Sequence, residues 1–198
     1  MITSIDQLDL GKKYSYADYL TWRFDEYVEL LRGKISRMAA PVRKHQFTAG
    51  EIHHLIRSHI NMRTCQVYAA PFDVRLLDNK KSTADKDIFT VVQPDVCVVC
   101  DLLKLDDKGC MGAPDMIIEV LSPGTQQKDI KDKFELYEFN GVKEYWIVSI
   151  NDEILTAFDL GEDNKFHFRQ TYVTNDKVTS RNLKGFSFEL SNIFEKKP

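Results

Sequence analysis

The segment Met116–Leu121 constrains the fold more than any other part of the chain. It reads Met-Ile-Ile-Glu-Val-Leu, so both alternating faces are apolar and only Glu119 interrupts them. Successive residues of a strand point to opposite faces of the sheet. A run that is apolar on both faces therefore predicts a central strand with packing elements on each side.

Length and charge limit the class of protein. The 198 residues are 43% hydrophobic, enough for one domain spanning residues 1–198 whose core needs neither a disulfide nor a structural metal. The 27 basic and 30 acidic residues give a formal charge of -3. This balance argues against a strongly basic surface that binds nucleic acid indiscriminately, but it leaves a local basic groove open.

The four cysteines are predicted to be buried free thiols. Cys97 and Cys100 lie in a strand pattern, where residues three apart point to opposite faces and cannot share one zinc ion. Cys65 and Cys110 offer no further ligands at a workable spacing. Zinc is the weaker alternative.

The first residues, Met1–Asp6, show neither a basic region nor an apolar region of a signal peptide. No run of about 18 apolar residues occurs in the chain. The sequence therefore predicts a cytoplasmic protein that does not enter a membrane.

The order of predicted elements indicates an α/β protein with a mixed sheet flanked by helices. Asp73 and Arg75 share one face of a predicted strand, and that face is expected to be exposed. The last third, Leu155–Phe194, is expected to form antiparallel strands. The predicted elements are a helix at Tyr16–Trp22, a hairpin of Tyr27–Leu31 and Ile35–Met38, a helix at Gln46–Met62, strands at Gln66–Ala70, Phe72–Leu76, Val91–Cys100 and Met116–Leu121, a loop at Lys104–Gly112, a helix at Lys128–Phe139 and a strand at Glu144–Ile150.

Two carboxylates interrupt the apolar strands. A buried Glu119 is costly unless its charge is compensated, and a bound cation is one such compensation. A strand end that reaches solvent, or a structural salt bridge, would explain it as well. Asp95 follows Pro94 inside a strong strand pattern, which indicates an edge, a bulge or a strand start. Asp95 and Glu119 on neighbouring strands could together hold Mg²⁺, which prefers oxygen ligands.

Lys133 is the third candidate. On a helical wheel it falls between Tyr137 and Leu136, inside the apolar arc of the helix, so it is expected to point toward the sheet. Snorkelling of the ammonium to solvent is the alternative. With the two carboxylates, Lys133 indicates metal-assisted phosphodiester hydrolysis. The lysine could stabilise developing negative charge, or it could position and deprotonate the nucleophile.

These residues occur in runs that resemble a known family. The runs are Gln93–Val96, Ala113–Pro123, the spacing Asp129-x-x-x-Lys133-x-x-x-Tyr137, and Gly141–Val148. They are similar to the Uma-two family of restriction-endonuclease-like proteins, within the PD-(D/E)XK superfamily. The resemblance covers most of the chain, from about Tyr14 to Leu160.

The resemblance implies a restriction-endonuclease-like αβββαβ core, here with an N-terminal hairpin and a C-terminal antiparallel β extension. It implies Mg²⁺ at the site, for which Mn²⁺ can substitute, with the Val120 carbonyl as a further ligand. The superfamily usually carries its lysine two residues after the acidic residue, where this chain has Leu121. The family resemblance moves that role to Lys133. Glu29 and His45 match family positions near the site and are weaker candidates for supporting roles.

The expected activity is therefore that of a magnesium-dependent endonuclease acting on DNA. Two alternatives stay open: a catalytically inactive nucleic-acid-binding module with the same fold, and a metal-dependent hydrolase of a smaller phosphoester. A cut across both strands would need two active sites, which makes a homodimer plausible.

Overall fold

The computed structural model describes residues 2–78, 82–121 and 127–195, with side chains from residue 130 in the last of these segments. The described strands form two six-stranded sheets and one two-stranded sheet. The N-terminal sheet has the order β2-β1-β5-β4-β8-β7, and the central sheet has the order β12-β11-β10-β9-β6-β3. This mixed α+β arrangement agrees with the predicted fold class.

Helices and strands have the following bounds. The helices are α1 (Tyr16–Tyr19), α2 (Arg43–His59) and α3 (Gln127–Asn140). The N-terminal sheet consists of β1 (Val28–Leu31), β2 (Lys34–Arg37), β4 (Val74–Leu76), β5 (Thr90–Val92), β7 (Leu105–Asp106) and β8 (Gly109–Met111). The central sheet consists of β3 (Gln66–Ala69), β6 (Val96–Val99), β9 (Met116–Leu121), β10 (Glu144–Ser149), β11 (Ile154–Leu160) and β12 (Phe166–Tyr172). The two-stranded sheet pairs β13 (Lys177–Thr179) with β14 (Ser187–Glu189).

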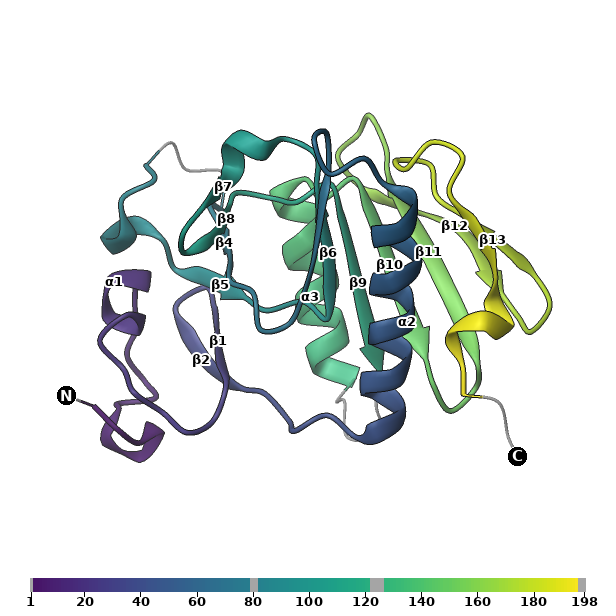
Figure 1. The fold of residues 1–198 in the computed structure, drawn as a ribbon. Coiled ribbons are helices and arrows are strands. Elements are labelled where there is room, and N and C mark those ends of the chain that lie inside the picture. Colours follow the sequence, from purple (N-terminus) through teal and green to yellow (C-terminus); the bar gives the residue numbers. More distant parts are fainter. Residues whose placement is uncertain (1, 79–81, 122–126, 196–198) are drawn as a thin grey trace.

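Strand β9 is the central strand that its sequence predicts. It pairs in parallel with β10 and antiparallel with β6. Ile118 packs in a core with Ile52 of α2, and Ile117 packs in a second core with Leu136 of α3. Figure 1 shows the two helices on opposite faces of the central sheet. Among the described residues, no helix has both the length and the apolar character that a membrane span requires.

The prediction of one strand at Val91–Cys100 was wrong, because this segment forms β5 and β6 in different sheets. Pro94 lies between them and has no N–H for a ladder hydrogen bond, which ends the first strand. The link of Gln93, Pro94 and Asp95 thus carries the chain from the N-terminal sheet to the central sheet.

Other boundaries also differ from the prediction. The segment predicted as a loop at Lys104–Gly112 contains the hairpin of β7 and β8, which joins the N-terminal sheet alongside β4. Helix α1 ends at Tyr19 and α2 begins at Arg43, earlier than the expected Trp22 and Gln46. Helix α2 also ends earlier, at His59, because Ile60 adopts an extended conformation.

The prediction of four free thiols was wrong for two of them. Cys65 and Cys100 form a disulfide, while Cys97 and Cys110 are free and buried. The antiparallel register of β3 and β6 pairs Gln66 with Val99. The adjoining residues, Cys65 and Cys100, therefore lie opposite each other. The bond therefore depends on a strand pairing that sequence spacing does not specify.

The C-terminal segment extends the central sheet, as predicted, and is tied to it by Glu144. This carboxylate is fully buried at the start of β10. It accepts hydrogen bonds from Arg169 on β12 (2.7 Å) and from the hydroxyl of Ser180 (2.6 Å). Glu144 is thus a structural anchor.

Candidate active site

Lys133 lies between two buried carboxylates. Its Nζ donates to Oε1 of Glu119 at 3.0 Å and to Oε1 of Glu29 at 2.9 Å. One turn further along α3, the hydroxyl of Tyr137 donates to the same Glu119 oxygen at 2.6 Å. The inward face of α3 therefore carries both a cation and a phenol to β9, and the side chain of Lys133 does not project into bulk water.

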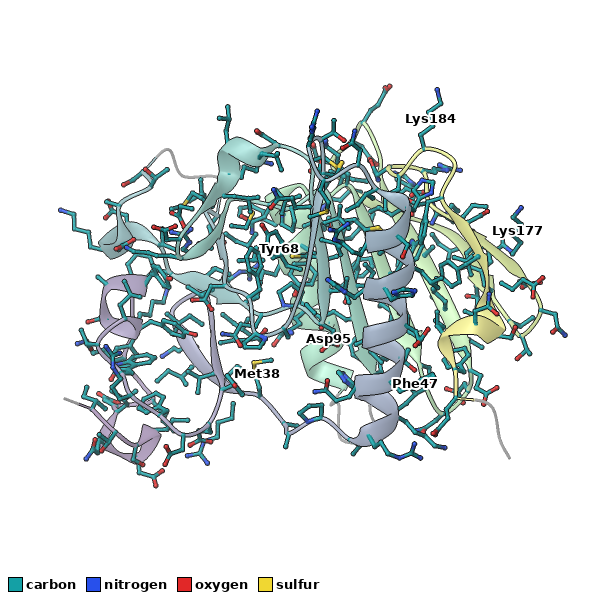
Figure 2. The ribbon with its side chains drawn as sticks, in the orientation of Figure 1. Met38, Phe47, Tyr68, Asp95, Lys177 and Lys184 are labelled. Carbon is teal, nitrogen blue, oxygen red and sulfur yellow. A yellow bond between two sulfur atoms is a disulfide. The ribbon has the colours of Figure 1, made fainter. Side chains whose placement is uncertain are left out.

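Asp95 lies beside this cluster. The register of β6 and β9 pairs Val96 with Ile118, and extending it by one residue sets Asp95 opposite Glu119. Oδ2 of Asp95 accepts the N–H of Val120 at 2.7 Å and lies 3.2 Å from Nε2 of His45 on α2. Figure 2 labels Asp95 beside α2, near one end of the central sheet.

Glu29 belongs to the same cluster. It lies on β1 of the N-terminal sheet with 3% of its surface exposed. The oxygen that binds Lys133 also accepts the backbone N–H of Gln93 at 2.8 Å. The site therefore forms where the two sheets meet.

The cluster carries an excess of negative charge. Glu119 is 8% exposed. Burial, together with the charges of Asp95 and Glu29, raises the Glu119 pKa to about 7 against the opposing charge of Lys133. The Lys133 ammonium binds two of the three carboxylates, and Asp95 faces His45 instead. Glu119 and Glu29 thus share one ammonium, so a further cation would be electrostatically favoured here.

The two basic groups respond to these carboxylates. Burial opposes the charge on Lys133, but Glu119 and Glu29 outweigh burial and raise the Lys133 pKa. Burial likewise opposes the charged His45 ring, but the hydrogen bond and charge of Asp95 outweigh it and raise the His45 pKa. The Val120 carbonyl contributes in the same direction, so His45 lies close to Asp95 and Val120 together.

The donor set fits a hard divalent cation. One oxygen of each carboxylate is occupied by protein donors, while Oε2 of Glu119 and Oδ1 of Asp95 accept no hydrogen bond from the described residues. Within the described part of the chain, no three His, Cys, Asp or Glu side chains form a ready-made metal site. Two carboxylates and the Val120 carbonyl would suffice for Mg²⁺, which usually keeps several waters.

Two neighbours of the site were not assigned a role from the sequence. Tyr137 was placed on the apolar face of α3 and in the family spacing with Lys133, but without a role, because a phenol on such a face gives no signal of a polar partner. Gln93 contacts Glu29 through its backbone, which sequence cannot reveal.

The expectation of an exposed face at Asp73 and Arg75 was wrong. Arg75 is 1% exposed and binds Asp106, and Asp73 accepts hydrogen bonds from Tyr16 and Gln93. The N-terminal segment with α1 covers this face, so the alternation of side chains was predicted correctly and its solvent exposure was not.

The fold is that of the restriction-endonuclease-like class. The chain belongs to the Uma2 family, whose model, described as "Putative restriction endonuclease", matches residues 16–191. It is 24% identical over 185 residues to "Uncharacterized protein slr1290" of Synechocystis, covering 92% of each chain.

A solved structure from Anabaena variabilis, described as "a putative nuclease belonging to DUF820", has the same fold. Its TM-score is 0.70 at 16% identity, over 91% of this chain and 97% of that chain. At this identity the likeness supports the fold alone.

Proposed function

We propose that this protein is a metal-dependent endonuclease that hydrolyses phosphodiester bonds of DNA. The observation that carries the proposal is the position of Lys133, whose ammonium lies 3.0 Å from Glu119 and 2.9 Å from Glu29, with Asp95 at the adjoining strand end. A buried cation among carboxylates of separate strands is typical of a site built for a charged substrate. Membership of a restriction-endonuclease-like family supports the nuclease part.

Asp95, Glu119 and the Val120 carbonyl would hold Mg²⁺, or Mn²⁺ in its place. The chemistry that such an ion supplies is polarisation of a phosphoryl oxygen and activation of water at neutral pH. His45 and the Val120 N–H hold one oxygen of Asp95 and leave the other free. Lys133 and Tyr137 likewise hold Oε1 of Glu119 and leave its Oε2 free of protein donors among the described residues.

Lys133 would act as a fixed positive charge. Its two carboxylate partners raise its pKa, so the amine stays protonated and is unsuited to take a proton from water. An ammonium held at this position can stabilise the negative charge that develops on the phosphoryl group. Of the two roles that the sequence left open for Lys133, we therefore propose charge stabilisation.

The test is cleavage of plasmid, single-stranded DNA, RNA and mononucleotides with Mg²⁺, with Mn²⁺ and with EDTA. We expect metal-dependent cleavage of DNA by the wild type and its loss in Glu119→Ala and Lys133→Met. Lys131→Met is a matched control on the same helix, because the Lys131 side chain is 75% exposed. Metal-dependent binding of DNA without cleavage would instead indicate an inactive binding module, and cleavage of mononucleotides alone would indicate a small-phosphoester hydrolase.

A cut across both strands of a duplex requires two active sites, and a second copy of this chain would supply the other. We therefore propose a homodimer as the working form. Sedimentation of the protein with and without duplex DNA tests the assembly.

A further inference from the structure

A second polar cluster lies on the other face of the N-terminal sheet. Val74 and Val92 pack in the core beneath α3, so strand alternation turns the neighbouring Asp73 and Gln93 to the opposite face, toward α1. The Asp73 carboxylate accepts Nε2 of Gln93 at 2.8 Å and the hydroxyl of Tyr16 at 3.2 Å.

Tyr19 completes this cluster. Its hydroxyl lies 3.4 Å from Asp73 and accepts a hydrogen bond from Nε2 of Gln93 at 3.2 Å. Burial, followed by the charge of Asp73, raises the pKa of both Tyr16 and Tyr19, so both phenols remain donors. The Asp73 carboxylate is therefore an acceptor surrounded by donors. A carboxylate in place of the Gln93 amide would be repelled by the negative charge of Asp73.

Gln93 connects this cluster to the active site through the sheet. Its side chain bonds to Asp73, while its backbone N–H bonds to the Glu29 oxygen that also binds Lys133. Only 7% of Gln93 is exposed, and its Oε1 is buried without a partner among the described residues. A buried unpaired oxygen is costly, so the amide donor and not the carbonyl accounts for a glutamine here.

Gln93 also fixes the link between the sheets. It follows β5 directly, and Asp95 comes two residues later, immediately before β6. The Asp95 carbonyl in turn accepts the N–H of Ala70 at 3.2 Å. The short link is thus held at both ends, by the Gln93 side chain and by the backbone of Asp95.

We propose that Gln93 is a positioning residue, whose amide is anchored on Asp73 and aligns Glu29 and Asp95 around Lys133. The effect of Gln93 on catalysis rests on the function proposed above. Its role in aligning Glu29 with Lys133 is structural and does not depend on that function.

The test replaces the amide by a carboxylate of the same size. In Gln93→Glu the new charge faces Asp73 and displaces the link. We expect kcat to fall about 10- to 100-fold, as for other residues that orient metal-site ligands, with KM little changed. The ammonium resonance of Lys133 in ¹⁵N-lysine-labelled protein, assigned by its absence from Lys133→Met, should also shift, and this readout needs neither metal nor DNA.

Rescue separates positioning from a general loss of structure. Asp73→Asn combined with Gln93→Glu exchanges the donor and the acceptor, and we expect it to restore both kcat and the Lys133 resonance. Gln170→Glu, an exposed glutamine on β12, adds the same charge elsewhere and should change neither.

A Gln93→Glu protein that matches Gln170→Glu in both readouts would overturn the proposal. If Gln93→Glu does not fold, the double variant decides: a wild-type Lys133 resonance supports the proposal, and its absence overturns it. If the wild type cleaves nothing, the proposed function fails while the resonance still decides the positioning role.

Discussion

The hydroxyl of Tyr137 donates a 2.6 Å hydrogen bond to Oε1 of Glu119, the oxygen that also accepts Nζ of Lys133 at 3.0 Å. Tyr137 follows Lys133 by four residues, so both donors come from one face of α3. Together they occupy one oxygen of the carboxylate. The rotation of Glu119 is thereby restricted, and its second oxygen accepts no hydrogen bond from the described residues.

Removing the Tyr137 hydroxyl should weaken metal binding without removing the ring from the core. We expect Tyr137→Phe to lower the affinity for Mn²⁺ by roughly 10-fold or more, because a ligand that loses its orienting hydrogen bond binds metal less tightly. Isothermal titration calorimetry measures this affinity. Tyr145→Phe is the matched control. The ring centroids of Tyr145 and Tyr137 lie 5.2 Å apart, and Tyr145 makes no hydrogen bond to Glu119 in the described structure. Equal affinities in the two variants would contradict the prediction.

Loss of the Lys133 charge should destabilise the fold as well as abolish activity. Lys133→Met leaves Glu29 and Glu119 buried without their cation, which costs roughly 3 kcal/mol in the free energy of unfolding. Adding Glu29→Gln removes one uncompensated charge and should recover part of the stability but no activity. Urea denaturation without metal measures both effects. A double variant no more stable than Lys133→Met would show that Glu29 and Lys133 are not coupled.

Metal affinity should depend on pH through Glu119. Burial raises the Glu119 pKa to about 7, so below that pH the carboxyl is protonated in the metal-free protein and must release its proton to bind a cation. Affinity for Mn²⁺ should therefore fall about tenfold per pH unit below 7 and level off above it. Calorimetry in buffers of different ionisation heat measures the affinity and the released proton. An affinity that is constant between pH 6 and 7 would be incompatible with a raised pKa.

Local periodicity was sufficient to predict the placement of those candidate site residues whose signal lies within a single element. Glu119 stood out because it interrupts a strand that is apolar on both faces, and that strand is the buried β9. Lys133 stood out because helical spacing turned it inward, and the structure brings it to Glu119. In each case one element contained the whole signal.

The parts that depend on contacts between elements could not be predicted in the same way. Pro94 indicated a break near Asp95, but only the assembled fold shows that the chain changes sheets there. Glu29 enters the site because β1 pairs with β5, where Leu30 faces Val91. Such pairings depend on registers between distant segments, which residue spacing does not encode.

The disulfide is a further contact of this kind, and it should contribute measurably to stability. Cys65 and Cys100 are separated by 35 residues, and closing a loop of that size stabilises the folded state by about 4 kcal/mol in the chain-entropy model. We expect reductant to lower the free energy of unfolding of the oxidised protein by that order, measured by urea denaturation. The double variant Cys65→Ser and Cys100→Ser keeps the buried thiols of Cys97 and Cys110 and should not respond to reductant. Four free thiols in the non-reduced protein by mass spectrometry, or a wild type indifferent to reductant, would rule the bond out as a stabilising element.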